Sequence, residues 1–371
     1  MANTTVFTRF PLRRIVLRAL PLLGGLAALC LFWATRGNTA LMDAWLAHVS
    51  MPVKRGISAV ADLVPFSVCE AGATVLIVWQ LVLLVRAIRR AVRGAGPGPL
   101  AHWAWQLAVW LVWGYAAVCA LWGTQYYGTG FAQRAGLQAP PPEVAHLAAV
   151  TDYFAQQVNA CADAVPRGED GTMQAEPAPT FAAARGLYQP MAERWPFLQG
   201  PERRPKPAFY SKLMSAWGFT GYLCPLVGES TLNVDAPAVF LPVTVAHELA
   251  HQRGVATEQE ANFVGILAAT GGDAAYQYSG WLFGYLHLSN ALWQADNTAA
   301  RESYATLCEG AQRDLAANNA YWASWEGPVR ETGETVYETF LQGYGQDLGL
   351  RSYGACVDLL VEWYLPRALA Q

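Results

Sequence analysis

Three long apolar segments in the first third of the 371-residue chain most constrain how it can fold. They lie at about residues 15–35, 66–85 and 103–122. A membrane-spanning helix needs roughly 20 mainly apolar residues. The first segment reaches that length only if it continues past Arg18. The whole chain is 53% hydrophobic and 14% charged, which is more apolar than an average soluble domain. We therefore expect three transmembrane helices and a lipid bilayer as partner.

Basic residues flank these segments unevenly. Four arginines stand at the start of the first segment and four follow the second, whereas the loop between them holds three basic residues. Because positive charge stays on the cytoplasmic side, we predict a multi-pass protein of the cell membrane with a cytoplasmic N-terminus and an extracytoplasmic C-terminal domain. The first segment can alternatively be a cleaved signal peptide, but no small-x-small cleavage site follows it. The arginines concerned are Arg9, Arg13, Arg14, Arg18, Arg86, Arg89, Arg90 and Arg93.

The rest of the chain has the pattern of one mainly helical domain. We divide the chain into a membrane domain at 1–122, a connector at 123–145 that includes three consecutive prolines, and an extracytoplasmic domain at 146–371. Residues 218–242 are rich in glycine, proline and β-preferring residues and predict one or two strands. The fold class is therefore mainly α with a small β element, an α+β domain attached to three N-terminal transmembrane helices. Helical periodicity is present at 143–163, 206–217, 244–253, 257–270, 277–294, 298–318, 334–341 and 352–364.

Charge and cysteine content narrow the remaining classes. The net charge is −3, and no basic patch is interleaved with aromatic residues, so we expect no nucleic-acid partner. Four cysteines lie in the outer region, Cys161, Cys224, Cys308 and Cys356. They can form disulfides in an oxidising compartment or act as four independent small apolar residues, and the sequence leaves both open.

The segment HELAH, residues 247–251, carries the chemistry. Positions i and i+4 of a helix share one face, so His247 and His251 can present two imidazole nitrogens to one metal ion. Glu248 projects beside that face and is placed to accept a proton from a zinc-activated water. Thr244 can cap the start of the helix, and Gly254 can supply the left-handed residue that ends it.

A third protein ligand is expected in the helix that follows. Thr257 and Glu260 have the spacing of a capping box, which gives Glu260 a structural role. Glu258 shares a face with the small residues 261, 262 and 265, whereas Glu260 shares its side with apolar residues that face a core. We therefore predict Glu258 as the third ligand of one Zn²⁺ per chain, with Glu260 as the alternative.

These residues resemble the gluzincin metallopeptidases. The HELAH motif followed by E-x-x-A-N at 258–262 is similar to the prenyl-protein protease, heat-shock membrane peptidase and ImmA/IrrE-type groups. The run from Lys206 to Phe263 after three apolar segments resembles an uncharacterised bacterial family of membrane zincins. The resemblance implies a zincin-like domain, Glu258 as ligand and a role for Asn262. The six residues between His251 and Glu258 are far fewer than in those membrane peptidases, so a tight helix-turn-helix must replace a long insertion.

Further residues have two interpretations each. Asn262 either fixes a ligand's orientation, as the resemblance suggests, or is a polar residue near a helix start. His287, Tyr285 and Tyr353 are candidates for transition-state stabilisation, although such residues more often serve packing. The strand-like segment GESTLN, residues 228–233, is expected to lie along the cleft and pair with an extended peptide.

The expected function is that of an integral-membrane zinc metallopeptidase acting on a peptide or protein substrate. His247, His251 and Glu258 would hold the zinc ion and Glu248 would act as general base. Whether the substrate is membrane-proximal stays open. The alternatives are a non-catalytic zinc-binding membrane sensor or assembly factor, and a purely structural membrane-anchored helical domain.

Overall fold

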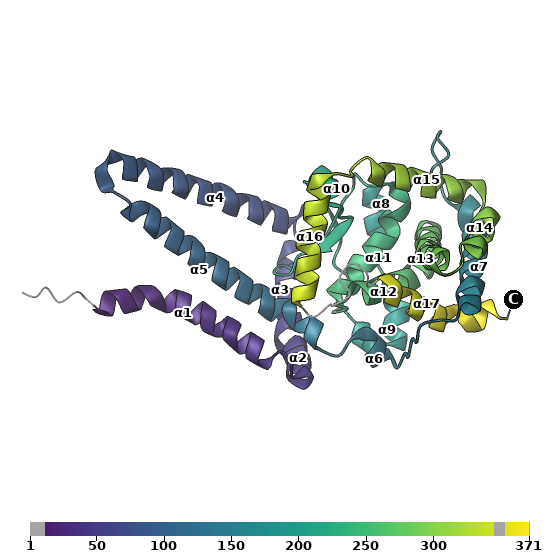
Figure 1. Ribbon diagram of the computed structural model, residues 1–371, viewed down its shortest axis with the longest axis horizontal. Helices are drawn as coiled ribbons and strands as arrows, with labels where there is room; N and C mark the ends of the chain where they lie inside the picture. Colours follow the sequence, from purple (N-terminus) through teal and green to yellow (C-terminus); the bar gives the residue numbers. More distant parts are fainter. Residues whose placement is uncertain (1–11, 345–352, 371) are drawn as a thin grey trace, which may run out of the picture.

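Three long helices extend from one side of a helical domain (Figure 1). The computed structural model describes residues 12–344 and 353–370. In Figure 1 the long helices run together away from the domain, and the domain contains every strand and most of the shorter helices. The long helices are α1 (Leu12–Thr35), α4 (Val68–Arg90) and α5 (Gly98–Leu121).

These three helices are long and apolar enough to cross a membrane, which confirms the coarse prediction. Their apolar stretches are bounded at Leu17–Thr35, Val68–Ala95 and Gly98–Leu121, so the second ends later and the third starts earlier than predicted. Arginine is a good helix former, and the backbone therefore stays helical beyond the apolar run that ends at Val85. Gly94 and Gly96 then adopt positive φ values of 96° and 65°, which reverse the chain into α5.

Close packing holds α1 against α5. A Cβ added at Gly25 would lie 2.7 Å from Val112, so the two helices approach closely at this glycine. The indole of Trp113 also donates a hydrogen bond to the carbonyl of Pro21 at 2.8 Å. By contrast, α4 and α5 diverge from their shared turn toward the domain (Figure 1). Between α1 and α4 the chain forms α2 (Thr39–Trp45), η1 (Leu46–Ser50) and α3 (Met51–Ala61).

The domain has one continuous apolar core. Helices α7 (Val144–Cys161), α11 (Leu241–Gln252), α12 (Glu258–Thr270), α13 (Ala274–Ala295) and α17 (Tyr353–Ala368) surround it. Phe131, from the predicted connector, is buried in the same core. The other helical elements are η2 (Ala91–Ala95), η3 (Gly123–Tyr127), α6 (Phe131–Ala135), η4 (Ala162–Ala164), α8 (Pro177–Ala183), α9 (Gln189–Arg194), η5 (Pro196–Leu198), α10 (Ser211–Trp217), η6 (Ala238–Phe240), α14 (Asn297–Thr306), α15 (Glu309–Ala323) and α16 (Pro328–Gly343).

A small three-stranded sheet packs beside α11. Its order is β1 (Lys206–Pro207), β3 (Ser230–Leu232) and β2 (Gly221–Leu223), with β1 parallel and β2 antiparallel to β3. Two strands lie in the predicted region, but β1 lies in the segment 206–217 that we expected to be helical. The Lys206 ammonium binds the Glu229 carboxylate at 2.9 Å and the Ala61 carbonyl at 2.6 Å, which holds this segment extended, and the helix begins only at Ser211.

Three local predictions about where helices begin or continue were wrong. Helix α11 begins at Leu241, so Thr244 lies inside it and donates to the Phe240 carbonyl instead of capping the start. Thr257 is the first non-helical residue before α12 but makes no side-chain cap, so the capping box with Glu260 does not form. The predicted helix 298–318 is broken where the amide of Cys308 donates to Asn159 of α7. The left-handed Gly254, with φ 87°, is confirmed.

Candidate metal centre

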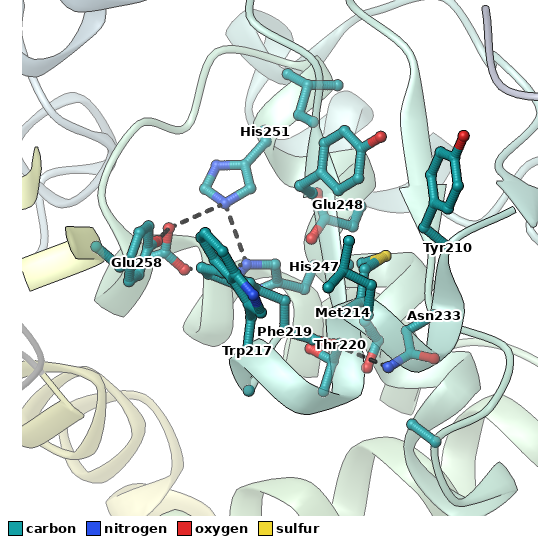
Figure 2. A pocket seen from close by; sticks show the side chains of 18 of the residues that line it. Tyr210, Met214, Trp217, Phe219, Thr220, Asn233, His247, Glu248, His251 and Glu258 are labelled. Carbon is teal, nitrogen blue, oxygen red and sulfur yellow. Dashed lines mark hydrogen bonds and ion pairs between the residues drawn. The ribbon is translucent and has the colours of Figure 1, made fainter. Parts of the chain in front are cut away.

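Two consecutive helices bring three potential ligands together. His247 and His251 lie one turn apart on α11, and Glu258 is the first residue of α12. The ligand atoms of the three residues lie within 4.8 Å of one another. The two Nε2 atoms are 3.1 Å apart, and Glu258 oxygens lie 3.3 Å from His247 Nε2 and 3.6 Å from His251 Nε2. Figure 2 shows the three side chains turned toward one another.

The approach of α12 to α11 depends on a glycine. A Cβ added at Gly265 would lie 2.9 Å from both the nitrogen and the Cα of His247, which are backbone atoms that cannot move aside cheaply. Ala261 and Ala250 are also buried at this contact. The small-residue face expected from the sequence therefore allows the carboxylate of Glu258 to reach the two imidazoles.

The orientation of His251 is fixed from behind. Its Nδ1 lies 2.7 Å from the carbonyl of Val255, in the turn between the two helices. Since a carbonyl only accepts, Nδ1 carries the proton and a neutral ring keeps the lone pair of Nε2 for a metal. The ring also packs edge-on against Trp122, with centroids 5.7 Å apart.

Glu258 has a partner that the sequence analysis missed. The hydroxyl of Tyr337, on α16, donates to Glu258 Oε1 at 2.6 Å. The two residues are 79 positions apart, and no local motif marks Tyr337. Only the tertiary packing of α16, which lines the same cavity, brings the tyrosine to this carboxylate.

Glu248 occupies a different environment from Glu258. It is buried, and its Oε2 has no hydrogen-bond partner among the described residues. A Cβ at Gly221 of β2 would lie 2.8 Å from Glu248 Oε1, so only glycine leaves room for the carboxylate there. An unpaired buried carboxylate oxygen is costly, and it indicates a polar group to be bound at this point.

The cluster shifts the protonation equilibria of its members. Burial alone would lower the pKa of His251, but the hydrogen bond to Glu258 and the charges of Glu258 and Glu248 raise that pKa to about 9. Burial also opposes charge on Glu258, yet hydrogen bonds from both histidines hold its pKa well below the ordinary value. Burial raises the pKa of Glu248, and the charges of the histidines offset this in part.

The donor set fits zinc. Two imidazole nitrogens and one carboxylate oxygen lie close enough together to bind one ion. Catalytic zinc sites use this combination of ligands. The His251 ring is held by a carbonyl, as metal-bound imidazoles usually are. The identity of the metal and the assignment of the three residues as ligands stay predictions.

A large cavity of about 1170 Å³ opens in front of these residues. Its polar lining includes His247, Glu248, His251 and Glu258. Aromatic and aliphatic side chains from several elements line the rest, and Figure 2 draws Trp217 and Phe219 among them. The site is thus accessible and mostly apolar around a few convergent polar groups, as ligand sites usually are.

The other predicted residues lie at varying distances from this centre. Asn262 and His287 line the cavity. Glu260 points away, because its Oε1 accepts the amide of Ala132 at 2.9 Å. Tyr285 is fully buried and is not part of the cavity wall. The side chain of Tyr353 lies outside the described residues.

The prediction that GESTLN pairs with a peptide was wrong in its choice of strand. Residues 230–232 form β3, the central strand, which already has a partner on each side. The strand at the cavity is β2, whose residues Gly221, Tyr222 and Leu223 all line it. Among the described strands β2 pairs only with β3, so its second edge has no strand partner.

The seven cysteines are free in the structure. Of the four outer ones, Cys224 and Cys356 are buried and Cys161 and Cys308 are partly buried. The structure therefore shows no disulfide among the described residues, and both alternatives for these cysteines stay open.

Comparison with known families gives one match. A family described as a protein of unknown function, DUF3810, matches residues 49–361, which is most of the chain. The chain belongs to this family. No curated protein and no solved structure matched the chain. The match begins in η1 and ends in α17, so it spans α4, α5 and the positions of His247, His251 and Glu258.

Proposed function

We propose that this DUF3810 protein is an integral-membrane, zinc-dependent metallopeptidase that hydrolyses peptide bonds. The observation that carries the proposal is the contrast between the carboxylates of Glu248 and Glu258 on consecutive helices. Glu258 points with His247 and His251 at a common centre, whereas Glu248 lies beside them with an oxygen that has no partner. A purely structural metal site needs the three converging side chains. It gains nothing from a fourth, unpaired carboxylate such as that of Glu248 beside them.

In this proposal a zinc ion held by His247, His251 and Glu258 supplies Lewis acidity toward water and toward a peptide carbonyl. Glu248 accepts the proton of the attacking water and donates it to the leaving amine. Burial raises the pKa of Glu248, which improves its match to neutral pH as a general base. Tyr337 positions Glu258 through its hydroxyl hydrogen bond. The carbonyl of Val255 positions the ring of His251.

The unpaired edge of β2 provides a place for the substrate backbone. An extended peptide added along an exposed strand edge forms main-chain hydrogen bonds, which hold it without regard to its side chains. At Gly221 the absence of a side chain keeps Glu248 next to that edge. A peptide bound there would lie in the cavity that the general base and the three proposed ligands also line.

Metal content and hydrolysis together test the proposal. Full-length protein purified in detergent should contain about one zinc per chain, and replacing His247, His251 or Glu258 by alanine should remove it. Glu248→Gln should retain the metal and lower hydrolysis of a peptide library, followed by mass spectrometry, by on the order of 10² to 10⁴-fold. Glu260→Gln is the matched control on α12 and should change neither measurement, since glutamine still accepts the Ala132 amide.

Two results would contradict the proposal. Metal retained in the Glu258→Ala protein and lost in Glu260→Gln would reassign the third ligand. Stoichiometric zinc without any cleavage that depends on Glu248 would favour the non-catalytic alternative, a zinc-binding membrane sensor or assembly factor.

We also propose that the domain lies on the extracytoplasmic side, because the arginine-rich turn between α4 and α5 then faces the cytoplasm. A protease added to intact cells should cleave a tag at the C-terminus, and the same tag should be protected in inverted vesicles. The opposite pattern of protection would reverse the orientation.

A further inference from the structure

One wall of the cavity belongs to a membrane helix. Six residues of α4 line it, and they recur every three to four positions, so that they form one stripe along the helix. At a rise of 1.5 Å per residue the stripe is about 13 Å long and runs along a helix long and apolar enough to cross a membrane. The stripe consists of Cys69, Glu70, Ala73, Thr74, Ile77 and Val78.

The far end of this stripe is open. Ile77 and Val78 line the cavity and are nevertheless 60% and 54% exposed. Leu213 and Trp217 of α10 also line the cavity and are exposed as well. Large apolar side chains at an opening are unfavourable in water, whereas beside a membrane helix they lie against lipid. The cavity therefore has an apolar mouth between α4 and α10.

The position of α4 as a wall is fixed by polar contacts at its outer end. Glu70 accepts the amide of Phe209 at 2.6 Å, and the hydroxyls of Thr74 and Tyr210 lie 2.8 Å apart. Glu229, in the turn before β3, accepts the amide of Cys69 at 2.7 Å. These contacts attach α4 to α10 and to the sheet, so the apolar mouth is part of the folded domain.

The cavity thus changes in character along its length. Its mouth is apolar and adjoins a membrane helix, and its other end holds His247, Glu248, His251 and Glu258. A peptide that enters from a bilayer must find partners for its backbone groups, because unpaired amides are costly in an apolar phase. Strand β2 also lines the cavity, and its edge without a strand partner can accept the peptide as an added strand.

We propose that the substrate is the apolar, membrane-proximal segment of a membrane-anchored polypeptide, and that it enters through the mouth between α4 and α10. Ile77, Val78 and Leu213 contact its apolar side chains. This inference rests on the proposed peptidase function, and it adds the class of substrate and its route.

The test uses the full chain reconstituted in phosphatidylcholine and phosphatidylglycerol vesicles. One randomised ten-residue peptide library is supplied in two forms, soluble and fused to an apolar 20-residue helix that anchors it in the same vesicles. Wild-type protein should cleave the anchored form at least about 10-fold faster, because the anchor raises the effective concentration at the mouth. Equal rates for the two forms would overturn the inference and leave the peptidase proposal standing.

Two valines on α4 provide a matched pair of variants. Val78 lines the cavity, whereas Val75 is 69% exposed and does not. Val78→Trp should narrow the mouth and lower cleavage of the anchored library several-fold more than cleavage of the soluble one. Val75→Trp should leave both rates unchanged. If the two variants behave alike, with zinc content retained in both, the proposed route is wrong.

A second measurement does not depend on hydrolysis. In Glu248→Gln protein, a photo-crosslinking residue placed at position 78 should capture the anchored peptide, and the same residue at position 75 should not. Capture of the anchored peptide at position 78, without any hydrolysis by the wild type, would support the apolar segment as the molecule bound in the cavity. It would contradict the peptidase proposal. Capture of lipid alone at both positions would overturn the inference.

Discussion

Helices α4 and α12 both carry many apolar side chains, but those of α12 are buried within the protein and most of those of α4 are exposed. On α12 the side chains of Phe263, Val264 and Ile266 are fully buried in the core of the domain. On α4 most of the apolar side chains, including Val75 and Ile77, are exposed. The protein itself supplies the apolar surroundings of α12, whereas α4 is long and apolar enough to cross a membrane, and we propose that a lipid bilayer surrounds it. The difference explains why the candidate metal centre is built on α11 and α12, whose positions the protein core determines.

The largest effect is expected from removing a buried ring. Phe263→Ala should lower the free energy of unfolding of the domain by about 3–5 kcal/mol, because it removes apolar contacts and leaves a cavity. The matched change Val75→Ala on α4 should stay within about 0.5 kcal/mol, since the side chain packs against no core. Thermal unfolding in detergent micelles, followed by tryptophan fluorescence, measures both. Equal destabilisation by the two changes would show that α4 packs against protein as α12 does.

Lys54 tests the junction between the two regions. It lies on α3, is buried, and its ammonium has no hydrogen-bond partner among the described residues. It lies over the ring of Trp122, just beyond the end of α5, at 5.2 Å. Burial, with a smaller contribution from Arg55, lowers the pKa of Lys54 to about 7. The folded protein therefore binds this proton less well than the unfolded chain.

Lys54→Met should consequently stabilise the protein, by up to about 4 kcal/mol at pH 7 and below, because each unit of pKa difference corresponds to about 1.4 kcal/mol. Between the folded pKa of about 7 and the unfolded value of 10.5, the unfolded chain holds the proton and the folded chain has lost it. The wild type thus gains stability as pH rises through this window, and the advantage of the variant disappears above it. Melting temperatures of both proteins measured across pH 6.5–10.5 test the prediction. A difference that does not change with pH would mean that packing, and not charge, causes it.

A smaller effect is expected from two glycines on the same pair of helices. Gly265→Ala should cost about 1–2 kcal/mol, because the added methyl group meets the backbone of His247 and separates α12 from α11. The separation should also weaken zinc binding, measured by competition with a chelator. Gly72→Ala on α4 has nothing within 4 Å of the added Cβ and should be neutral or slightly stabilising in the helix. Unchanged zinc affinity in Gly265→Ala would show that the site tolerates a wider helix spacing.

The sequence predicted local features of the site better than contacts between distant segments. The pair His247 and His251, the turn at Gly254 and the close face of α12 follow from helical periodicity and glycine geometry, which are local properties. The predicted cap at Thr244 failed because the helix begins earlier and the hydroxyl donates to the Phe240 carbonyl one turn back. The capping box of Glu260 failed because a tertiary contact with Ala132 gives that carboxylate another partner.

Long-range pairing explains the remaining differences. Strand β1 is extended because Lys206 binds Glu229 and Ala61, and no periodicity within residues 206–217 encodes that contact. Tyr337 reaches Glu258 from 79 residues away for the same kind of reason. The apolar mouth on α4 also depends on where α10 docks. Hydropathy alone identified the three apolar helices, but it could not indicate that one of them lines the cavity.

Tyr337 offers the mildest test, because its helix touches both regions. Phe340 on α16 and Tyr344 just after it pack near the ends of α1 and α5, while Tyr337 reaches Glu258. Tyr337→Phe keeps the ring against Phe219 and removes only the hydroxyl, so it should weaken zinc binding by about 10-fold. Its folding should stay intact. Tyr304→Phe, an exposed change on α14, is the control and should leave affinity unchanged.

The direction of this effect separates two roles for the hydroxyl. If it only orients Glu258, zinc affinity falls and the hydrolysis rate of zinc-saturated protein recovers, because excess metal compensates for the lost hydrogen bond. If the hydroxyl instead contacts the reacting peptide, the rate stays low even when the metal site is full. Unchanged affinity together with an unchanged rate would mean that α11 and α12 alone define the centre. The membrane-facing helices and α16 would then influence only how a substrate enters.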